Sequence, residues 1–241
     1  MLNNSLELNP QSMANLGNKS KRFNTTTLLL CEGIEDRSFL RALIGGRNLG
    51  PFDVKTASDI CGDAGKGAFS KALEYAVPIT GFGNIERIGI IADADNHYRK
   101  TVNDICDQIK KANENSNVAG RFSIPAAPYQ LSGGKPRIMI VLFPAQNRRG
   151  ALDTLLWGAI QDMKIFAGKL HCIEESVDCA DIRKWQKATL DKSRVRIALA
   201  LSHKRSPAVS IRKIWLQYPD VIPIASEEFD EIAKAISLIR S

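Results

Sequence analysis

Residues 85–95 have the sequence IERIGIIADAD, a hydrophobic run that ends in two acidic residues, Asp93 and Asp95. A continuous apolar run of this length is typical of a strand that is buried on both faces, as in a parallel sheet. The polar turn after it leads into a stretch in which Val102, Ile105 and Ile109 recur at helical spacing. The segment therefore predicts a strand that feeds a helix.

The same alternation of apolar runs and amphipathic stretches continues on both sides of this segment. TTTLLLC and RIMIVLFP are further strand-like runs, and GALDTLLWGAI opens a helical pattern directly after the second of them. Alternation of this kind is typical of an α/β fold, here a Rossmann-like parallel sheet of about four strands flanked by helices. The expected strands are at residues 25–31, 54–60, 85–95 and 137–144.

The rest of the chain divides into a tail, a long connection and a C-terminal portion. Residues 1–24 are rich in Asn and Ser and lack the apolar core of a signal peptide, which predicts a flexible tail and a cytoplasmic protein. Residues 113–136 are expected to form a loop or to hold one short element. Beyond them the pattern is mainly helical, although residues 195–201 also fit strand alternation. We expect a single domain over residues 25–241.

The composition, 44% hydrophobic and 24% charged, is that of an ordinary globular protein. No apolar run approaches the roughly 18 residues of a membrane span, so we expect no membrane association. The five cysteines include no CxxC pair and the three histidines are far apart, which argues against a disulfide framework and against zinc. A hydrophobic core is the expected source of stability.

Positive charge is concentrated late in the chain. Between Arg183 and Lys213 ten basic residues stand with one acidic residue, Asp191, in a protein of net charge +7. A concentrated basic face attracts nucleic acid, although a solvated helix in a basic protein explains the same pattern. The side chains expected to contact a nucleic-acid backbone are Arg183, Lys184, Lys187, Arg194 and Arg196, together with Lys66.

Lys66 belongs to a glycine-rich turn, CGDAGKG, at residues 61–67. The turn joins a strand to a helix, but Gly67 stands where a phosphate-binding loop of an ATPase requires Ser or Thr. ATP hydrolysis is therefore not expected. Two interpretations stay open, a nest of backbone amides that contacts a nucleic-acid phosphate and a simple tight turn.

Acidic residues follow the predicted strands. Glu32, Asp93 and Asp95 lie at strand ends, which meet at the ligand-binding edge of a parallel sheet. Carboxylates crowded at one place repel one another and bind cations, and their oxygens suit Mg²⁺ or Mn²⁺. Asp36, one helical turn after Glu32, and Asp153, in the next strand-to-helix connection, complete the expected metal ligands. The alternative for these two is a simple interaction with a helix dipole.

The pattern CEGIEDRSFLRAL, which contains Glu32 and Asp36, and the Asp93-x-Asp95 pair resemble the Toprim (topoisomerase–primase) domain. The chain is most similar to the Toprim part of overcoming-lysogenization-defect nucleases, and GALDTLL resembles a later motif that usually carries Glu where this chain has Asp153. The resemblance implies metal-dependent chemistry on phosphodiester bonds. It also implies a lysine that assists at the phosphate, for which Lys192 is the best match and Lys187 a weaker one.

The expected function is a Mg²⁺- or Mn²⁺-dependent nuclease, or a related phosphodiester-processing protein, that acts on DNA or RNA in defence or repair. Its expected catalytic residues are Glu32, Asp93, Asp95 and Lys192. The alternative is a non-catalytic or partner-activated nucleic-acid-binding protein that works with an ATPase. The sequence leaves the oligomeric state open.

Overall fold

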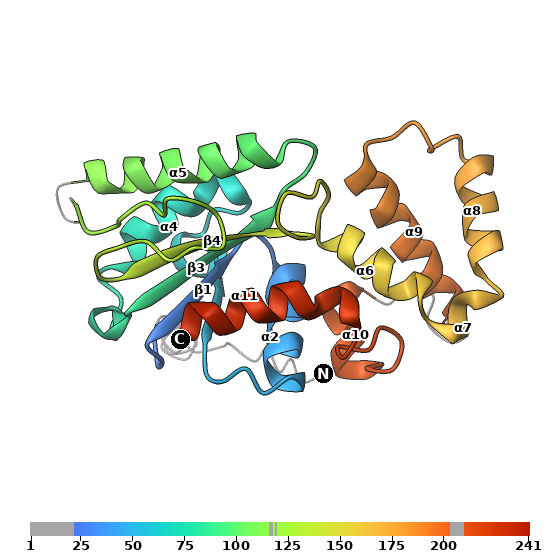
Figure 1. Ribbon diagram of the computed structural model, residues 1–241, viewed down its shortest axis with the longest axis horizontal. Helices are drawn as coiled ribbons and strands as arrows, with labels where there is room; N and C mark the ends of the chain where they lie inside the picture. Colours follow the sequence, from blue (N-terminus) through green and yellow to red (C-terminus); the bar gives the residue numbers. More distant parts are fainter. Residues whose placement is uncertain (1–21, 116–117, 119, 203–209) are drawn as a thin grey trace, which may run out of the picture.

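The protein is built around a four-stranded, all-parallel sheet (Figure 1). The computed structural model describes residues 22–115, 118, 120–202 and 210–241. The strands are β1 (Thr27–Cys31), β2 (Asp53–Thr56), β3 (Arg87–Asp93) and β4 (Arg137–Phe143), in the order β2-β1-β3-β4. The predicted Rossmann-like α/β fold is confirmed.

Helices cover both faces of the sheet because its strands are apolar on both sides. Leu29 and Cys31 of β1 are buried in the core on one face, and Leu28 and Leu30 in the core on the other. Figure 1 shows helices packed against both faces. They are α2 (Ile34–Gly46) and α11 (Asp230–Arg240) on one face, and α4 (Phe69–Ala76) and α5 (Tyr98–Glu114) on the other.

The C-terminal portion extends the core beyond β4 (Figure 1). Its helices are α6 (Leu152–Gln161), α7 (Lys164–Ala167), α8 (Leu170–Cys179), α9 (Lys187–Ser202) and α10 (Ile211–Gln217). α6 packs along α9, which buries Val195, Ala198 and Leu199 at helical spacing. Residues 195–201 therefore belong to a helix, and the alternative of a strand at these residues is wrong.

The second strand is shorter than predicted, because a helix begins inside the expected range. β2 ends at Thr56, and residues 57–61 form the short helix α3 (Ala57–Cys61). The Thr56 hydroxyl accepts a hydrogen bond from the Asp59 N–H at 3.1 Å, and Asp59 accepts one from the Thr56 N–H at 2.8 Å. This reciprocal capping box starts the helix, and the Thr-x-x-Asp spacing is its sequence signature.

The ordered fold begins slightly before residue 25. Phe23 is buried and lies edge-on to Phe82, with 5.9 Å between the ring centroids, and the Asn24 N–H donates to Asp53 at 2.7 Å. Residues 1–21 of the predicted tail lie outside the described residues. The connection from α5 to β4 contains turns where it is described, without a helix or strand. Across the described ranges, no helix has both the length and the hydrophobicity of a membrane span.

The described residues also include the short 3₁₀ helices η1 (Lys66–Ala68), η2 (Phe82–Asn84) and η3 (Glu227–Phe229). The order of the strands also locates the binding crevice. The chain leaves β1 for α2 on one face and leaves the neighbouring strand β3 for α5 on the other. In open α/β sheets, ligands bind where two such connections diverge at the carboxyl ends of the strands.

Candidate functional site

Glu32 and Asp93 lie at this divergence point. Cys31 is paired with Ile91, so Glu32 follows β1 level with Ala92, one residue before Asp93, the last residue of β3. The Asp93 carboxylate accepts a hydrogen bond from the Leu152 N–H at 2.8 Å, which ties β3 to the start of α6. Burial raises the pKa of Asp93 well above its ordinary value, and the nearby charges of Asp36 and Glu32 raise it further.

Asp36 lies in the first turn of α2 and is buried. Its carboxylate accepts a hydrogen bond from the Gly33 N–H at 2.7 Å, which caps the helix. Burial raises the pKa of Asp36 to about 7. The hydrogen bond from the Gly33 N–H lowers this pKa, whereas the negative charges of Glu32 and Asp153 raise it further. Asp36 therefore caps the helix and also interacts electrostatically with Glu32 and Asp153.

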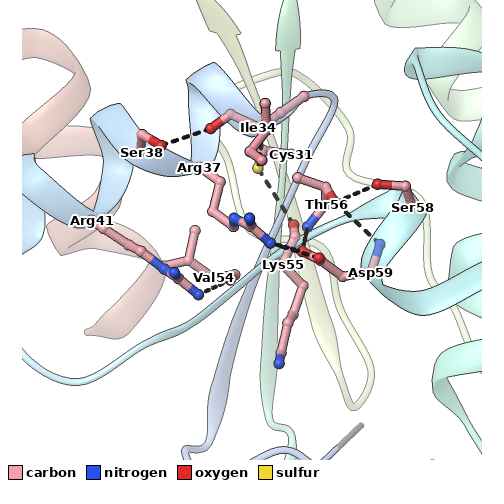
Figure 2. Close-up of polar contacts among 11 residues, drawn as sticks. Cys31, Ile34, Arg37, Ser38, Arg41, Val54, Lys55, Thr56, Ser58 and Asp59 are labelled. Atoms are coloured by element: carbon pink, nitrogen blue, oxygen red, sulfur yellow. Dashed lines mark hydrogen bonds and ion pairs between the residues drawn. The ribbon is translucent and has the colours of Figure 1, made fainter. Parts of the chain in front are cut away.

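The start of α2 is anchored to the neighbouring strand by polar contacts (Figure 2). The Arg37 guanidinium donates to both carboxylate oxygens of Asp59 in α3, at 2.6 and 2.5 Å. The Cys31 thiol donates to the Lys55 carbonyl at 3.4 Å. Burial raises the pKa of Asp59, but the Thr56 N–H and Arg37 outweigh it and hold that pKa below its usual range. These contacts fix the end of β1, and with it Glu32.

Lys66 and Asp95 meet at the same edge. The Lys66 ammonium forms an ion pair with the Asp95 carboxylate. Burial raises the pKa of Glu32, Lys66 opposes that rise, and Asp95 adds to it, so all three charged groups interact. The glycine-rich turn thus directs its lysine toward the acidic residues, whereas the sequence suggested a phosphate contact or a simple turn.

Gly150 links Asp95 to the last strand-to-helix connection. The two residues exchange backbone hydrogen bonds of 2.7 Å in each direction, with Asp95 at φ +50° and Gly150 at φ +133°. A Cβ atom on Gly150 would lie 2.4 Å from the Thr154 hydroxyl in α6. Only glycine fits this position, so the residue fixes the distance between Asp95 and the start of α6.

Asp153 is buried in the first turn of α6. Burial raises its pKa to about 6; Lys192 from α9 lowers it, and Glu35 from α2 raises it. One Asp153 oxygen is buried without a hydrogen-bond partner among the residues that the structure describes, and the same holds for one oxygen of Glu32. Acids from three strand-to-helix connections therefore interact, and Lys192 lies within electrostatic reach of one of them.

The other predicted phosphate contacts on and near α9 are engaged in ion pairs. Arg183 pairs with Glu174 and Asp178 of α8, and Lys184 pairs with Asp181, just after that helix. Arg196 reaches Glu35 at 2.6 Å. Lys187 and Arg194 flank the fully buried Asp191, at 2.8 and 3.2 Å. Lys204 and Arg205 of the same basic segment lie outside the described residues. Lys192 is exposed and forms none of these close ion pairs.

Glu35 and Asp191 have roles that were not predicted from the sequence. Glu35 interacts with Asp36 and Asp153 and holds Arg196, although it looked like an ordinary helix residue. Asp191 organises two of the basic residues that were expected to bind nucleic acid. Its spacing from Lys187 and Arg194, four and three residues along one helix, was the available sequence pattern.

The chemistry of these side chains fits a divalent cation. The acidic side chains here supply carboxylate oxygens, which suit Mg²⁺ or Mn²⁺, and two of the buried oxygens lack a hydrogen-bond partner within the described ranges. In the described part of the chain, however, Asp, Glu, His and Cys side chains form no group of three already close enough to hold a metal ion. Lys66 instead supplies the positive charge beside Asp95. Cation binding therefore requires side chains to reorient.

Comparison with known proteins gives one match. Residues 26–218 match the model of a family described as "Protein of unknown function (DUF3226)". No curated protein and no solved structure matches the chain. The matched region includes the whole sheet, the acidic residues and α9. The chain belongs to the DUF3226 family.

Proposed function

We propose that this protein is a divalent-metal-dependent phosphodiesterase that cleaves DNA or RNA. The observation that carries the proposal is the convergence of carboxylates at the divergence point of the sheet, where the charges of Asp36 and Glu32 both act on Asp93. Such clusters carry a large electrostatic cost unless a cation or protons neutralise them. The resemblance to Toprim nucleases in the same positions supports the same assignment.

The residues that would hold the metal are Glu32, Asp36, Asp93, Asp95 and Asp153. When bound, Mg²⁺ or Mn²⁺ would activate water and neutralise charge on the scissile phosphate. The protein backbone orients two of these carboxylates, since the Leu152 N–H donates a hydrogen bond to Asp93 and the Gly33 N–H donates one to Asp36. Burial raises the pKa values of Asp36 and Asp153, and a cation bound beside them would lower both values, so metal binding would release protons from these groups.

Lys192 is the group that would neutralise charge on the phosphate. It is exposed on α9 and acts electrostatically on Asp153, so it borders the acidic residues without being held by a close ion pair. Replacement of Lys192 with Met is expected to lower the rate of cleavage on the order of a hundredfold at saturating substrate. Lys110→Met is the matched control, because Lys110 pairs with Asp107 in the later turns of α5, away from the acids.

The test of the proposed function is a cleavage assay on plasmid DNA, single-stranded DNA and RNA in Mn²⁺, Mg²⁺ or EDTA. The variants are Glu32→Gln and Asp93→Asn, with Glu227→Gln as an exposed control. The amides keep the shape of the side chains and remove charges whose burial is unfavourable, so both variants are expected to fold.

Metal-dependent cleavage that is lost in both site variants and kept in Glu227→Gln is the expected result. Cleavage that neither variant changes would refute the assignment of the site. Absence of cleavage on all substrates, together with salt-sensitive binding, would favour the alternative of a non-catalytic or partner-activated binding protein that works with an ATPase.

A further inference from the structure

An open pocket of about 680 Å³ lies beside the acidic residues, and none of its lining residues was expected to bind a ligand. It is formed by the connection from β3 to α5 and the connection from β4 to α6, which the Asp95–Gly150 backbone bridge joins. Asn96, on one side, directly follows Asp95, and Arg149, on the other, directly precedes Gly150. The pocket is therefore continuous with the candidate site.

The pocket is rich in positive charge. Arg99 and Lys100 line it from the start of α5, and Arg149 lines it from the opposite connection. Lys100 is paired with Asp104 at 2.6 Å, whereas Arg99 and Arg149 form no ion pair with any acidic residue that the structure describes. All three side chains are exposed. They differ in this from the basic residues of α9, whose charges are largely neutralised within the protein.

The charges of Arg99 and Lys100 are also unfavourably placed within their own helix. α5 begins at Tyr98, and no acidic residue lies in its first turn. The N-terminal end of a helix carries a partial positive charge, so cations there cost free energy and anions are stabilised. The exposed side chain of His97, which precedes the helix, does not cap it. These cations thus stand at a helix end that favours anions, and they line a pocket. An anionic ligand in the pocket would offset their unfavourable charge.

We infer that this pocket binds phosphate groups of a nucleic-acid strand and presents the neighbouring phosphodiester bond to the carboxylates. The choice of ligand rests on the proposed function, whereas the anionic chemistry follows from the pocket itself. Guanidinium groups bind phosphate oxygens with two parallel hydrogen bonds, which suits Arg99 and Arg149. The neighbouring Arg148 is exposed as well, so the positive surface continues beyond the pocket, as an extended strand requires.

The test is a binding measurement in EDTA, which excludes cleavage. Fluorescence anisotropy of labelled oligonucleotides, one single-stranded DNA and one RNA of the same sequence, is followed at increasing salt concentration. The variant is Arg99→Gln/Arg149→Gln, with Lys71→Gln/Lys110→Gln as the control that removes two cations already paired with acids. Melting by circular dichroism establishes that both proteins are folded.

The pocket variant is expected to weaken binding at least tenfold. Its plot of log affinity against log salt is expected to be less steep by about one to two units, because two phosphate contacts are lost. The control variant is expected to change neither quantity by as much. Preference for the DNA or the RNA strand would identify the substrate, and either preference supports the proposal.

The proposal is overturned if the wild type binds neither oligonucleotide, if the pocket variant binds as the wild type does, or if the control loses as much affinity. This outcome is separate from the proposed function. If binding in EDTA depends on the pocket but no cleavage occurs in Mn²⁺, the nuclease function is refuted and the phosphate site is retained. If a pocket variant cleaves and its binding is unchanged, the phosphate site is refuted and the nuclease function is retained.

Discussion

The Lys66 ammonium forms an ion pair with the Asp95 carboxylate, although the two residues belong to different strand-to-helix connections. Lys66 also lowers the pKa of Glu32, which burial raises. In the protein without metal, this lysine therefore supplies part of the positive charge that the acids require. A divalent cation at the same carboxylates would compete with it, since two positive charges beside Asp95 repel each other.

Replacement of Lys66 with Met tests this competition. The variant is expected to be less stable in EDTA by no more than about 1 kcal/mol, because the ion pair is partly exposed. Its melting temperature is expected to rise more on addition of Mn²⁺ than that of the wild type, since binding to the folded state stabilises it. Lys71→Met, which breaks an exposed pair with Asp63, is the control. An equal or smaller Mn²⁺ response in Lys66→Met would contradict the competition.

The raised pKa of Asp36 predicts how stability depends on pH. In the folded protein this pKa is about 7, against an ordinary value of 3.8, so the folded state holds a proton that the unfolded state releases. The contribution to stability is fully present below about pH 4 and is lost as pH rises through about 7. Asp153, with a pKa of about 6, acts in the same direction.

Asp36→Asn is therefore expected to flatten the decline in stability between about pH 4 and about pH 7. The asparagine oxygen can still accept the hydrogen bond from the Gly33 N–H, so the helix cap is kept. Urea unfolding in EDTA at several pH values measures the effect, with the exposed Asp220→Asn as control. The interpretation fails if Asp36→Asn and wild type lose stability in parallel over this range.

Gly150→Ala is expected to disrupt the site through the backbone. The new Cβ would lie 2.4 Å from the Thr154 hydroxyl, and the φ of +133° is unfavourable for alanine. We expect a loss of stability on the order of 2–3 kcal/mol and a loss of metal binding, because the bridge to Asp95 is strained. Gly168→Ala, with nothing within 4 Å of the added atom, should unfold like the wild type. Thermal melts that show equal stability for both variants would contradict this role of Gly150.

The sheet and the positions of the acids could be predicted from the sequence, because both depend on local patterns. Apolar runs such as the one ending at Asp93 determine where strands lie, and the parallel arrangement brings the ends of different strands to one edge. The end of β2 was misplaced by four residues, since the capping box at Thr56 and Asp59 overrides the continuing apolar pattern.

The roles of the basic residues could not be predicted in the same way. Ion pairs such as Arg196 with Glu35, which are 161 residues apart, depend on tertiary packing and leave no local pattern. The net charge of the basic segment from Arg183 to Lys213 therefore overstated how much positive charge on α9 is left unpaired. The pocket at Arg99 and Arg149 was missed for the opposite reason, since its two sides are far apart in the sequence and neither is strongly basic by itself.

The most direct test of the shared carboxylate site is isothermal titration of Mn²⁺ into the metal-free protein. We expect saturable binding that weakens at least tenfold in Glu32→Gln and in Asp93→Asn and is unchanged in Glu227→Gln. If the wild type shows no saturable binding, or if both site variants bind Mn²⁺ as the wild type does, then the acids at these strand ends do not share a divalent cation.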